Sequence, residues 1–300
     1  MLQSLRLFVA AYETRSFTAA AQREHATQSG VSQHVRNLEQ RHGVRLFVRE
    51  GSGMQPTEAA HAFYGHCVAA LRAVEEGEAA LRTHAGGISG VAVVGLMPTV
   101  TAAALAPALI DFRQRHPNAH VRIVEGFSGA LTATTLAGEL DFAVVPAMAP
   151  VAGLRIRGFL EMEEMFVSRD TGSPATPEPL ALAEMGPLKL ILPEAGNVRA
   201  STIRTFVATR GVTIAEEIEI DSMMAALDLI ARSDWCAILP ALMMASRPRR
   251  QGLQVRPIAP PLALELVMVE PARRPASTVA MAFHDCLLRA CRTLLAIRPG

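Results

Sequence analysis

From residue 91 to residue 297 the chain alternates short apolar runs with longer segments of helical spacing, and this alternation strongly constrains its fold. Short apolar runs bounded by turn residues are typical of buried strands, whereas apolar residues three and four apart are typical of helices packed on a sheet. The alternation favours α/β layers with largely parallel sheets. The predicted strands cover 91–96, 120–125, 141–146, 188–192, 216–220, 235–239 and 264–269, and the predicted helices cover 100–116, 129–138, 197–210, 222–233 and 276–297.

A long predicted helix precedes this region. Thr57 is placed to cap it, Glu58 lies in its first turn, and the helical pattern continues to about residue 85. Its apolar stripe is typical of a helix that pairs with a second copy, but also of one that covers a core of its own chain. Its position between two domains favours pairing, and the glycine-rich residues 86–90 predict a flexible joint. The stripe consists of Ala60, Phe63, Cys67, Ala70, Val74, Gly77 and Leu81.

The first 57 residues predict three short helices and a hairpin. The helices are expected over 2–14, over 18–24, and from a Thr27 cap to about His42, where Gly43 suits the position that ends a helix. Residues 44–57 alternate in hydrophobicity around a Gly-Ser-Gly turn, which predicts a small two-stranded wing. This arrangement is typical of a winged helix-turn-helix.

The third predicted helix has an apolar side and a side of short polar residues. Glutamine can bond adenine in a bidentate fashion, serine can bond several bases, and a helix N-terminus favours a phosphate. The polar side therefore suits DNA, although spacing alone leaves open an ordinary solvated helix face. The apolar side carries Val31, Val35 and Leu38, and the polar side carries Gln28, Ser29, Ser32, Gln33 and Arg36.

Charge is distributed unevenly along the chain. Residues 1–56 hold seven arginines and four glutamates, although the 300-residue chain has a formal net charge of only +1. This balance excludes a wholly basic nucleic-acid coat protein but allows a local DNA-binding face. Arg36, Arg45 and Arg49 are the predicted phosphate contacts, which fix register without reading sequence.

The cysteine usage and the N-terminus predict a cytoplasmic protein. Four scattered cysteines without a CxxC pair suit buried positions in a reducing compartment. Arg6, Glu13 and Arg15 interrupt the first apolar stretch, which argues against a signal peptide. The uncharged window 91–110 contains Gly95, Pro98 and Pro107, so a strand, a turn and a helix explain it better than a membrane span.

The run from residue 16 to residue 60 resembles the N-terminal signature of the LysR-type transcriptional regulators. The resemblance implies contacts to double-stranded promoter DNA from Thr27 and from Ser52 in the wing, in addition to the polar residues above. The family commonly has proline after the glutamine, whereas Ser29-Gly30 stand here, which implies a looser helix opening. The matched positions are Ala20-Ala21, Thr27-Gln28, Ser32, Leu38-Glu39, Gly43, Leu46, Phe47, Arg49 and Thr57-Glu58-Ala59.

Segments 94–109, 125–145 and 188–199 also resemble this family. The resemblance implies two α/β subdomains of periplasmic-binding-protein type with an effector between them, and self-association as a dimer or tetramer. The implied domains are a winged helix-turn-helix over 1–58, a linker helix over 59–86 and an effector-binding domain over 87–300. Subdomain I is expected at about 90–162 and 268–297, and subdomain II at about 163–267, with crossovers at about 163–168 and 262–268.

Strand ends and helix starts supply the predicted effector site, because open α/β sheets bind ligands beyond the carboxyl ends of their strands. Hydroxyls and free backbone N–H groups there suit an anion, so an organic carboxylate is the expected effector; each hydroxyl could equally be a plain helix cap. The candidates are Pro98, Thr99, Val100, Thr101, Ser128, Pro146, Ala147, Gly196, Asn197, Val198, Asp221 and Ser222.

Two other classes compete with a regulator. Residues 126–130 resemble a nucleophile elbow but lack its final glycine, which argues against an enzyme. His61 and His66 are five residues apart and therefore do not share a helical face for a metal. We expect no catalytic residue, metal or cofactor; the alternative is a ligand-binding or enzymatic α/β protein without regulatory DNA binding.

Overall fold

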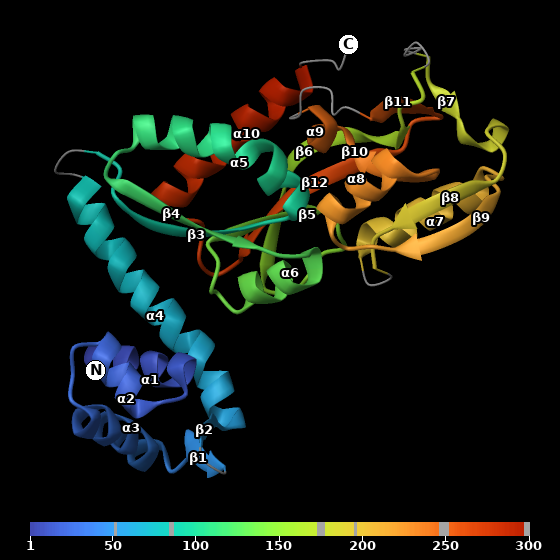
Figure 1. The fold of residues 1–300 in the computed structure, drawn as a ribbon. Coiled ribbons are helices and arrows are strands. Elements are labelled where there is room, and N and C mark those ends of the chain that lie inside the picture. The colour runs from blue at the N-terminus through green and yellow to red at the C-terminus, as the bar shows by residue number, and fades with distance from the viewer. Residues whose placement is uncertain (51–52, 84–86, 173–177, 195–196, 246–251, 297–300) are drawn as a thin grey trace. The chain divides into compact units, whose positions relative to one another are not determined.

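The computed structural model describes residues 1–50, 53–83, 87–172, 178–194, 197–245 and 252–296 (Figure 1). The chain forms two compact units. One contains residues 1–90 with residues 137–139, and the other contains 91–136 and 140–300. The described residues include no helix long and apolar enough to cross a membrane.

Three helices open the first unit: α1 (Leu2–Thr14), α2 (Phe17–Arg23) and α3 (Gln28–His42). Ser16 caps α2 by accepting a hydrogen bond from the Ala19 amide, and Thr27 caps α3 by accepting one from the Gly30 amide. Gly43 ends α3 in the left-handed region, at φ 68°, where glycine carries no steric cost. The three predicted helices therefore form within a residue of their expected bounds.

A hairpin and a long helix complete this unit. Strands β1 (Phe47–Glu50) and β2 (Gly53–Pro56) pair antiparallel as the wing, and α4 (Glu58–Thr83) follows. The ring of Phe8 lies at the centre of the core, 5.8 Å from that of Phe47 and 5.0 Å from that of Phe63. Helix α1, the wing and α4 therefore share one hydrophobic core.

The apolar stripe of α4 divides into two parts. Ala60 and Cys67 are buried and Phe63 packs on the core of this unit, so the first part covers its own chain. Ala70 is exposed and Val74 is half-buried in the described chain. The alternative of a helix covering its own core is thus correct for the first half of the stripe, and exposed stripe positions begin at Ala70.

The second unit is built on a ten-stranded mixed sheet with the order β4-β3-β5-β12-β6-β10-β8-β9, from which β11 and β7 branch (Figure 1). Its first half alternates strand and helix as predicted. The elements are β3 (Gly90–Leu96), α5 (Pro98–Arg115), β4 (Ala119–Glu125), α6 (Ser128–Leu136) and β5 (Phe142–Pro146).

The second half continues this alternation around one long strand. The elements are β6 (Leu154–Arg169), β7 (Leu180–Ala181), a 3₁₀ turn (Leu182–Glu184), β8 (Leu188–Leu192), α7 (Val198–Thr209), β9 (Ile214–Glu219), α8 (Met223–Arg232), β10 (Trp235–Pro240), α9 (Ala241–Ala245), β11 (Leu253–Ala259), β12 (Ala263–Pro271) and α10 (Thr278–Ala296).

Helices cover both faces of the sheet in this half. Leu190 and Leu192 of β8 pack with α7, whereas Ile191 between them packs with α8. This two-residue alternation with both faces buried explains why the last three residues of β8, Leu190 to Leu192, are all apolar. In the other half of the sheet, Phe112 of α5 meets Phe283 of α10 edge to face, with ring centroids 5.6 Å apart.

Strand β6 connects the two halves of the sheet. It pairs with β12 from Leu154 to Glu163 and with β10 from Glu164 to Val167. The Glu164 amide also donates to the Leu262 carbonyl, 2.8 Å away, just before β12 begins. Two backbone segments of the described chain therefore cross side by side from one half of the sheet to the other. This arrangement is typical of a hinge between two lobes, each lobe being one half of the sheet with its helices.

Candidate nucleic-acid interface and effector cleft

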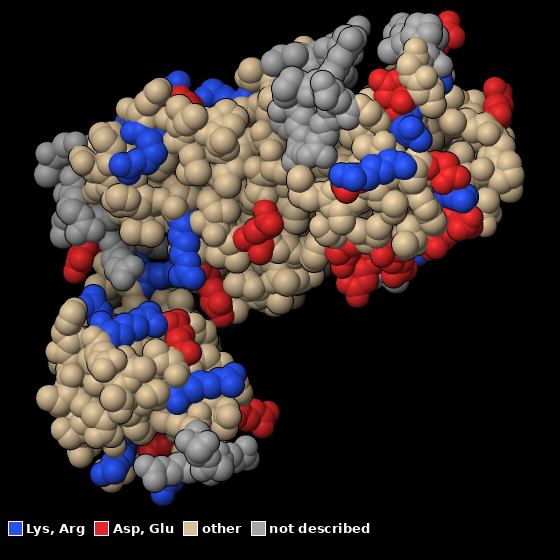
Figure 2. Space-filling model, in the orientation of Figure 1, with Lys and Arg blue, Asp and Glu red and all other residues tan. Residues whose placement is uncertain are grey.

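Helix α3 presents a polar edge to solvent. Its apolar residues Val31, Val35 and Leu38 are buried in the core of the first unit. The predicted DNA-contacting residues lie on the other side: Thr27, Gln28, Ser29, Gln33 and Arg36 are exposed and Ser32 is half-buried. Figure 2 shows basic side chains along the edge of this unit where α3 lies in Figure 1.

The opening of α3 is fixed by Thr27 despite the missing proline. The Gly30 amide donates to the Thr27 hydroxyl at 3.1 Å, and the Ser29 hydroxyl lies 3.2 Å from that same oxygen. A side chain at Gly30 would place its Cβ 3.0 Å from the Thr27 hydroxyl, so glycine leaves room for this cap. The opening of α3 thus has a side-chain cap without the proline, and the looser opening expected from Ser29-Gly30 stays a prediction.

Glu39 ties the wing to α3. Its carboxylate accepts hydrogen bonds from the Leu46 amide at 2.7 Å and from the Phe47 amide at 3.3 Å. Arg45 is highly exposed and its guanidinium lies 3.9 Å from the same carboxylate, so it is available to a phosphate. The side chain of Arg49 and the whole of Ser52 lie outside the described residues, and their predicted DNA contacts stay predictions.

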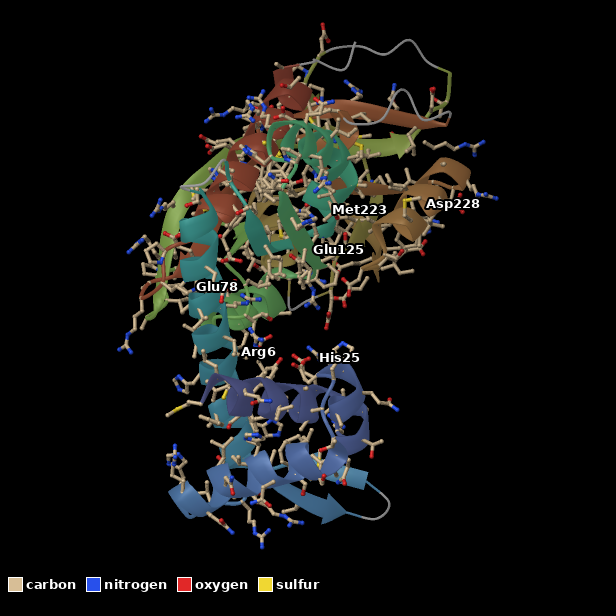
Figure 3. The ribbon with its side chains drawn as sticks, turned by 90° about the vertical axis from the view of Figure 1, so that its left-hand side faces the viewer. Arg6, His25, Glu78, Glu125, Met223 and Asp228 are labelled. Carbon is tan, nitrogen blue, oxygen red and sulfur yellow. The ribbon has the colours of Figure 1, made fainter. Side chains whose placement is uncertain are left out.

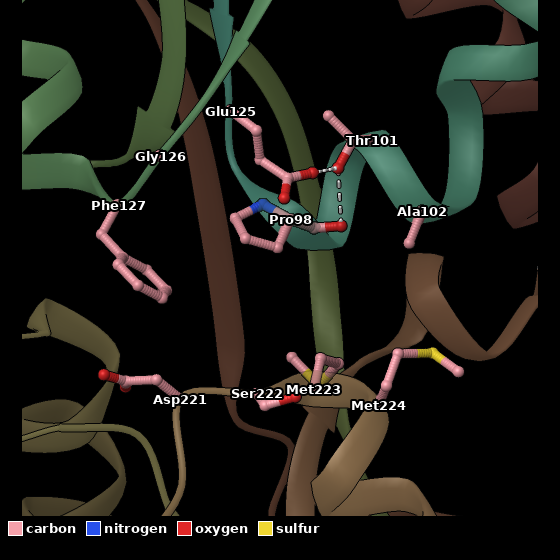
Figure 4. A pocket seen from close by; sticks show the side chains of 10 residues that line it. All are labelled: Pro98, Thr101, Ala102, Glu125, Gly126, Phe127, Asp221, Ser222, Met223 and Met224. Atoms are coloured by element: carbon pink, nitrogen blue, oxygen red, sulfur yellow. Dashed lines mark hydrogen bonds between the residues drawn. The ribbon is translucent and has the colours of Figure 1, made fainter.

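A cavity of about 700 Å³ lies in the second unit (Figure 4). It forms where β4 ends and where α5 and α8 begin, which is a usual place for a ligand in an open α/β sheet. Pro98, Thr101, Asp221 and Ser222 are predicted effector residues that line it. The remaining lining residues were not predicted: Ala102, Glu125, Gly126, Phe127, Met223 and Met224.

The other predicted effector residues do not line this cavity. Thr99 and Val100 are buried in the first turn of α5, and Pro146 is buried at the end of β5. Asn197 caps α7 by accepting from the Arg199 amide, as the plain-cap alternative allows. Ala147, Ser128 and Val198 lie at element ends outside the lining, and Gly196 is outside the described residues.

Two acidic side chains face the cavity. Glu125 accepts a hydrogen bond from the Thr101 hydroxyl, which also lies 3.0 Å from the Pro98 carbonyl. Asp221 is held by the Glu194 amide, which donates to one carboxylate oxygen at 2.9 Å. None of the lining residues that the structure describes is lysine, arginine or histidine. The only formal charges of the described lining are therefore negative, and the organic anion stays a prediction.

A buried ion pair lies where β6 changes partners. Arg199 of α7 binds Glu164 of β6 through two bonds, Nε to Oε1 at 2.8 Å and Nη2 to Oε2 at 3.0 Å. Arg199 also donates to the Ile238 carbonyl at 3.1 Å. Both side chains are buried, so each charge depends on the other for compensation. The pair joins the hinge strand to α7.

The four cysteines are all buried and unpaired. Burial raises the pKa of the Cys67, Cys236 and Cys291 thiols to about 12. Within the described part of the chain, no cluster of three or more histidine, cysteine, aspartate or glutamate side chains could hold a metal ion. The cysteines therefore behave as small buried hydrophobes.

The comparisons with known proteins agree with this architecture. The family model described as the LysR substrate binding domain matches residues 85–292, and the model described as a bacterial regulatory helix-turn-helix protein of the lysR family matches residues 2–61. The nitrogen assimilation regulatory protein nac of Klebsiella aerogenes is 31% identical over 293 residues, which cover 96% of this chain and 94% of that protein.

Two solved structures share the fold. Full-length OxyR from Pseudomonas aeruginosa, solved as a single-residue variant, has a TM-score of 0.73 at 20% identity and covers 96% of this chain and 94% of its own. Full-length CbnR complexed with its target DNA has a TM-score of 0.65 at 21% identity and covers 97% of this chain and 99% of its own.

A winged helix-turn-helix and a two-lobed α/β domain in one chain define a transcription regulator with a ligand-binding domain. The chain belongs to the LysR family of transcriptional regulators. The expected fold class and family are thereby confirmed, and the chain is a regulator and not an enzyme.

Proposed function

We propose that the polar edge of α3 enters a groove of operator DNA and that a small molecule in the cavity controls this binding. The observation that carries the proposal is the opening of α3. The Thr27 hydroxyl caps the helix there, and the side chains of Thr27, Gln28 and Ser29 are exposed. An exposed helix start with short polar side chains suits the major groove of a duplex.

Each predicted contact has a distinct role in this proposal. Gln28, Ser32 and Gln33 read base edges, whereas Arg36 and Arg45 bind phosphates and set register. Arg49 and Ser52 of the wing are proposed as further backbone contacts. The similar fold of CbnR, whose structure contains its target DNA, supports this assignment.

The proposed control acts through the hinge at β6. A ligand that contacts both α5 and α8 favours one arrangement of the two lobes, and it shifts the equilibrium only by its differential affinity for the two arrangements. We further propose that the chain works in the cytoplasm and self-associates through the exposed part of the α4 stripe, so that two copies of α3 contact one operator.

The DNA-binding proposal is tested by electrophoretic mobility shift on the DNA upstream of the protein's own gene, across a range of salt concentrations. Gln28→Ala should reduce discrimination by about 1–3 kcal/mol at one base position. Arg36→Ala should weaken binding to all sequences and lower the salt dependence by about one phosphate contact. Gln40→Ala, an exposed glutamine near the other end of α3, is the matched control.

The proposal fails if the unmodified protein shows no salt-dependent affinity for any duplex. It also fails if Gln28→Ala and Arg36→Ala bind DNA as well as Gln40→Ala does, because α3 would then be an ordinary solvated helix.

A further inference from the structure

The cavity of the second unit has two negatively charged walls. Glu125 lies at the end of β4 on one wall, and Asp221 lies just before α8 on the other (Figure 4). The described lining contains no positively charged side chain, and residues 195–196, which precede α7, are alanine and glycine. Two carboxylates facing one cavity favour a cation and oppose an anion.

Helix starts do not reverse this charge. Helices α5, α6 and α8 begin at or beside the cavity, and each N-terminus contributes about half a positive charge at most. Pro98 opens α5 without an N–H group, and the Val100 and Thr101 amides donate to the Met97 carbonyl. The three partial charges therefore do not cancel two full negative charges.

The two hydroxyls of the described lining already make hydrogen bonds within the protein, Thr101 as a donor and Ser222 as an acceptor. Thr101 donates to the Glu125 carboxylate, and Ser222 accepts a hydrogen bond from the Ala225 amide as the cap of α8. A ligand carboxylate would have to compete with Glu125 for the Thr101 proton. A ligand ammonium group, in contrast, meets two carboxylates, and no basic side chain of the described lining competes with it for them.

The rest of the lining is apolar and adaptable. Phe127 is 41% exposed and projects toward the opposite wall, and Met224 is 57% exposed beside Met223 (Figure 4). An aromatic face attracts a cation, and methionine side chains adapt to varied apolar shapes. Large apolar side chains left open to solvent around two carboxylates suit a ligand with both a positive charge and an apolar body.

We infer that the effector of this regulator is an organic cation, an amine with a short apolar chain or ring, held between Glu125 and Asp221. This inference rests on the proposed role of the cavity as the effector site. The ammonium group is attracted to the carboxylates of Glu125, at the end of β4, and Asp221, just before α8, and the apolar body covers Phe127, Met223 and Met224. Contact with both walls is what couples the ligand to the hinge.

Isothermal titration calorimetry of the full chain with probes of matched shape tests this inference. The pairs are 3-phenylpropylamine with 3-phenylpropionate, and 1,4-diaminobutane with succinate. We expect at least one amine to bind about tenfold or more tightly than its carboxylate partner. Glu125→Gln and Asp221→Asn should each weaken amine binding by about fivefold or more.

Asp228→Asn is the matched control, since it removes one carboxylate from the same helix as Met223 but outside the cavity lining (Figure 3). Asp228 is exposed and pairs with Arg232 one turn further on. Its substitution should leave amine affinity within about twofold, because solvent and salt screen an exposed charge that lies outside the cavity.

Tighter binding of the carboxylates overturns the inference, and so does the absence of amine binding. Amine binding that survives both Glu125→Gln and Asp221→Asn overturns it as well. The proposed function is judged separately by the mobility shift. If the protein binds DNA but no amine, the regulator stands and the cationic effector fails; if amines bind and DNA does not, the DNA-binding proposal fails.

Discussion

At the scale of single residues, Glu39 shows how one side chain can position a DNA-binding element. It lies on α3, its carboxylate accepts the amides of Leu46 and Phe47, and Leu46 and Phe47 are themselves buried. Removing the acceptor leaves two amides at the start of the wing without this partner. An unsatisfied buried donor costs more free energy than the hydrogen bond contributes when made.

We therefore expect Glu39→Ala to lower the free energy of unfolding of the N-terminal unit by about 1–3 kcal/mol. Glu39→Gln keeps one acceptor oxygen and should cost less. Urea unfolding followed by circular dichroism measures both, with Gln40→Ala as the neighbouring exposed control. Equal stability of Glu39→Ala and Gln40→Ala would show that the two amides find other partners.

The buried cysteines give a prediction about pH. Burial disfavours the charged thiolate, which raises the pKa from 9.0 in the unfolded chain to about 12 at Cys67, Cys236 and Cys291. The folded state holds these protons more tightly, so their contribution to stability is full below pH 9 and is lost as the pH rises toward 12.

At about pH 8 the native thiols should therefore react with a disulfide reagent such as DTNB much more slowly than free cysteine. A pKa of about 12 leaves about one thiolate in ten thousand at that pH. The reaction is followed by the absorbance of the thiolate released from the reagent. In denaturant, all four cysteines should react. Rapid reaction of the native protein would mean that at least one thiol is accessible.

The effector residues mark where sequence reasoning stopped at this scale. Hydroxyls and free amides at helix starts predict Thr101 and Ser222, which line the cavity. No local pattern predicts Phe127 and Met224, because exposed apolar residues are indistinguishable from core residues until the fold is known. Their positions follow from how the two lobes come together, which no local pattern encodes.

At the scale of elements, the linker helix α4 serves two purposes along its length. Its first turns carry Ala60, Phe63 and Cys67 into the core shared with α1 and the wing. The Tyr64 ring also stacks on Tyr12, with centroids 4.1 Å apart. Further along the stripe Ala70 and Gly77 are exposed and Val74 is half-buried, and this is the part that we propose pairs with a second copy.

We expect Ala70→Glu to weaken self-association, because it places a charge in the exposed part of the stripe. Ala62→Glu puts the same side chain on an exposed position outside the stripe and is the control. Sedimentation velocity should show a shift toward monomer for Ala70→Glu alone, with unchanged far-UV circular dichroism. An unchanged sedimentation coefficient would place the association elsewhere on the protein.

Most elements could be predicted because their local patterns agree with their surroundings. Helix α3 has a cap, an apolar stripe and a terminal glycine, and β8 has a buried apolar run. Strands β6, β7 and β11 were not predicted. Alternating charges such as Arg155 and Arg157 make β6 resemble a surface segment, and their ion-pair partner Glu270 lies more than a hundred residues away on β12.

At the scale of the whole molecule, β6 combines two structural tasks. It crosses between the lobes, and it carries Glu164 into a buried bidentate pair with Arg199. A buried pair adds little net stability compared with apolar residues, but losing one partner leaves an uncompensated charge. The hinge is therefore sensitive to either single substitution and much less sensitive to both together.

Two compact units within one chain should unfold in separate transitions, since the cores of the described parts are distinct. Arg199→Met should lower the midpoint of the second-unit transition by about 6–20 °C, from about 3–5 kcal/mol of destabilisation. The N-terminal transition should not move.

In the double variant Glu164→Met with Arg199→Met both charges are absent, and the midpoint of the second-unit transition should return most of the way to that of the unmodified protein. Differential scanning calorimetry separates the transitions, and the fragment 88–300 assigns them. If the double variant were as unstable as the sum of the single variants, the pair would act as two independent packing positions, and its role as a charge-compensated link at the hinge would be wrong.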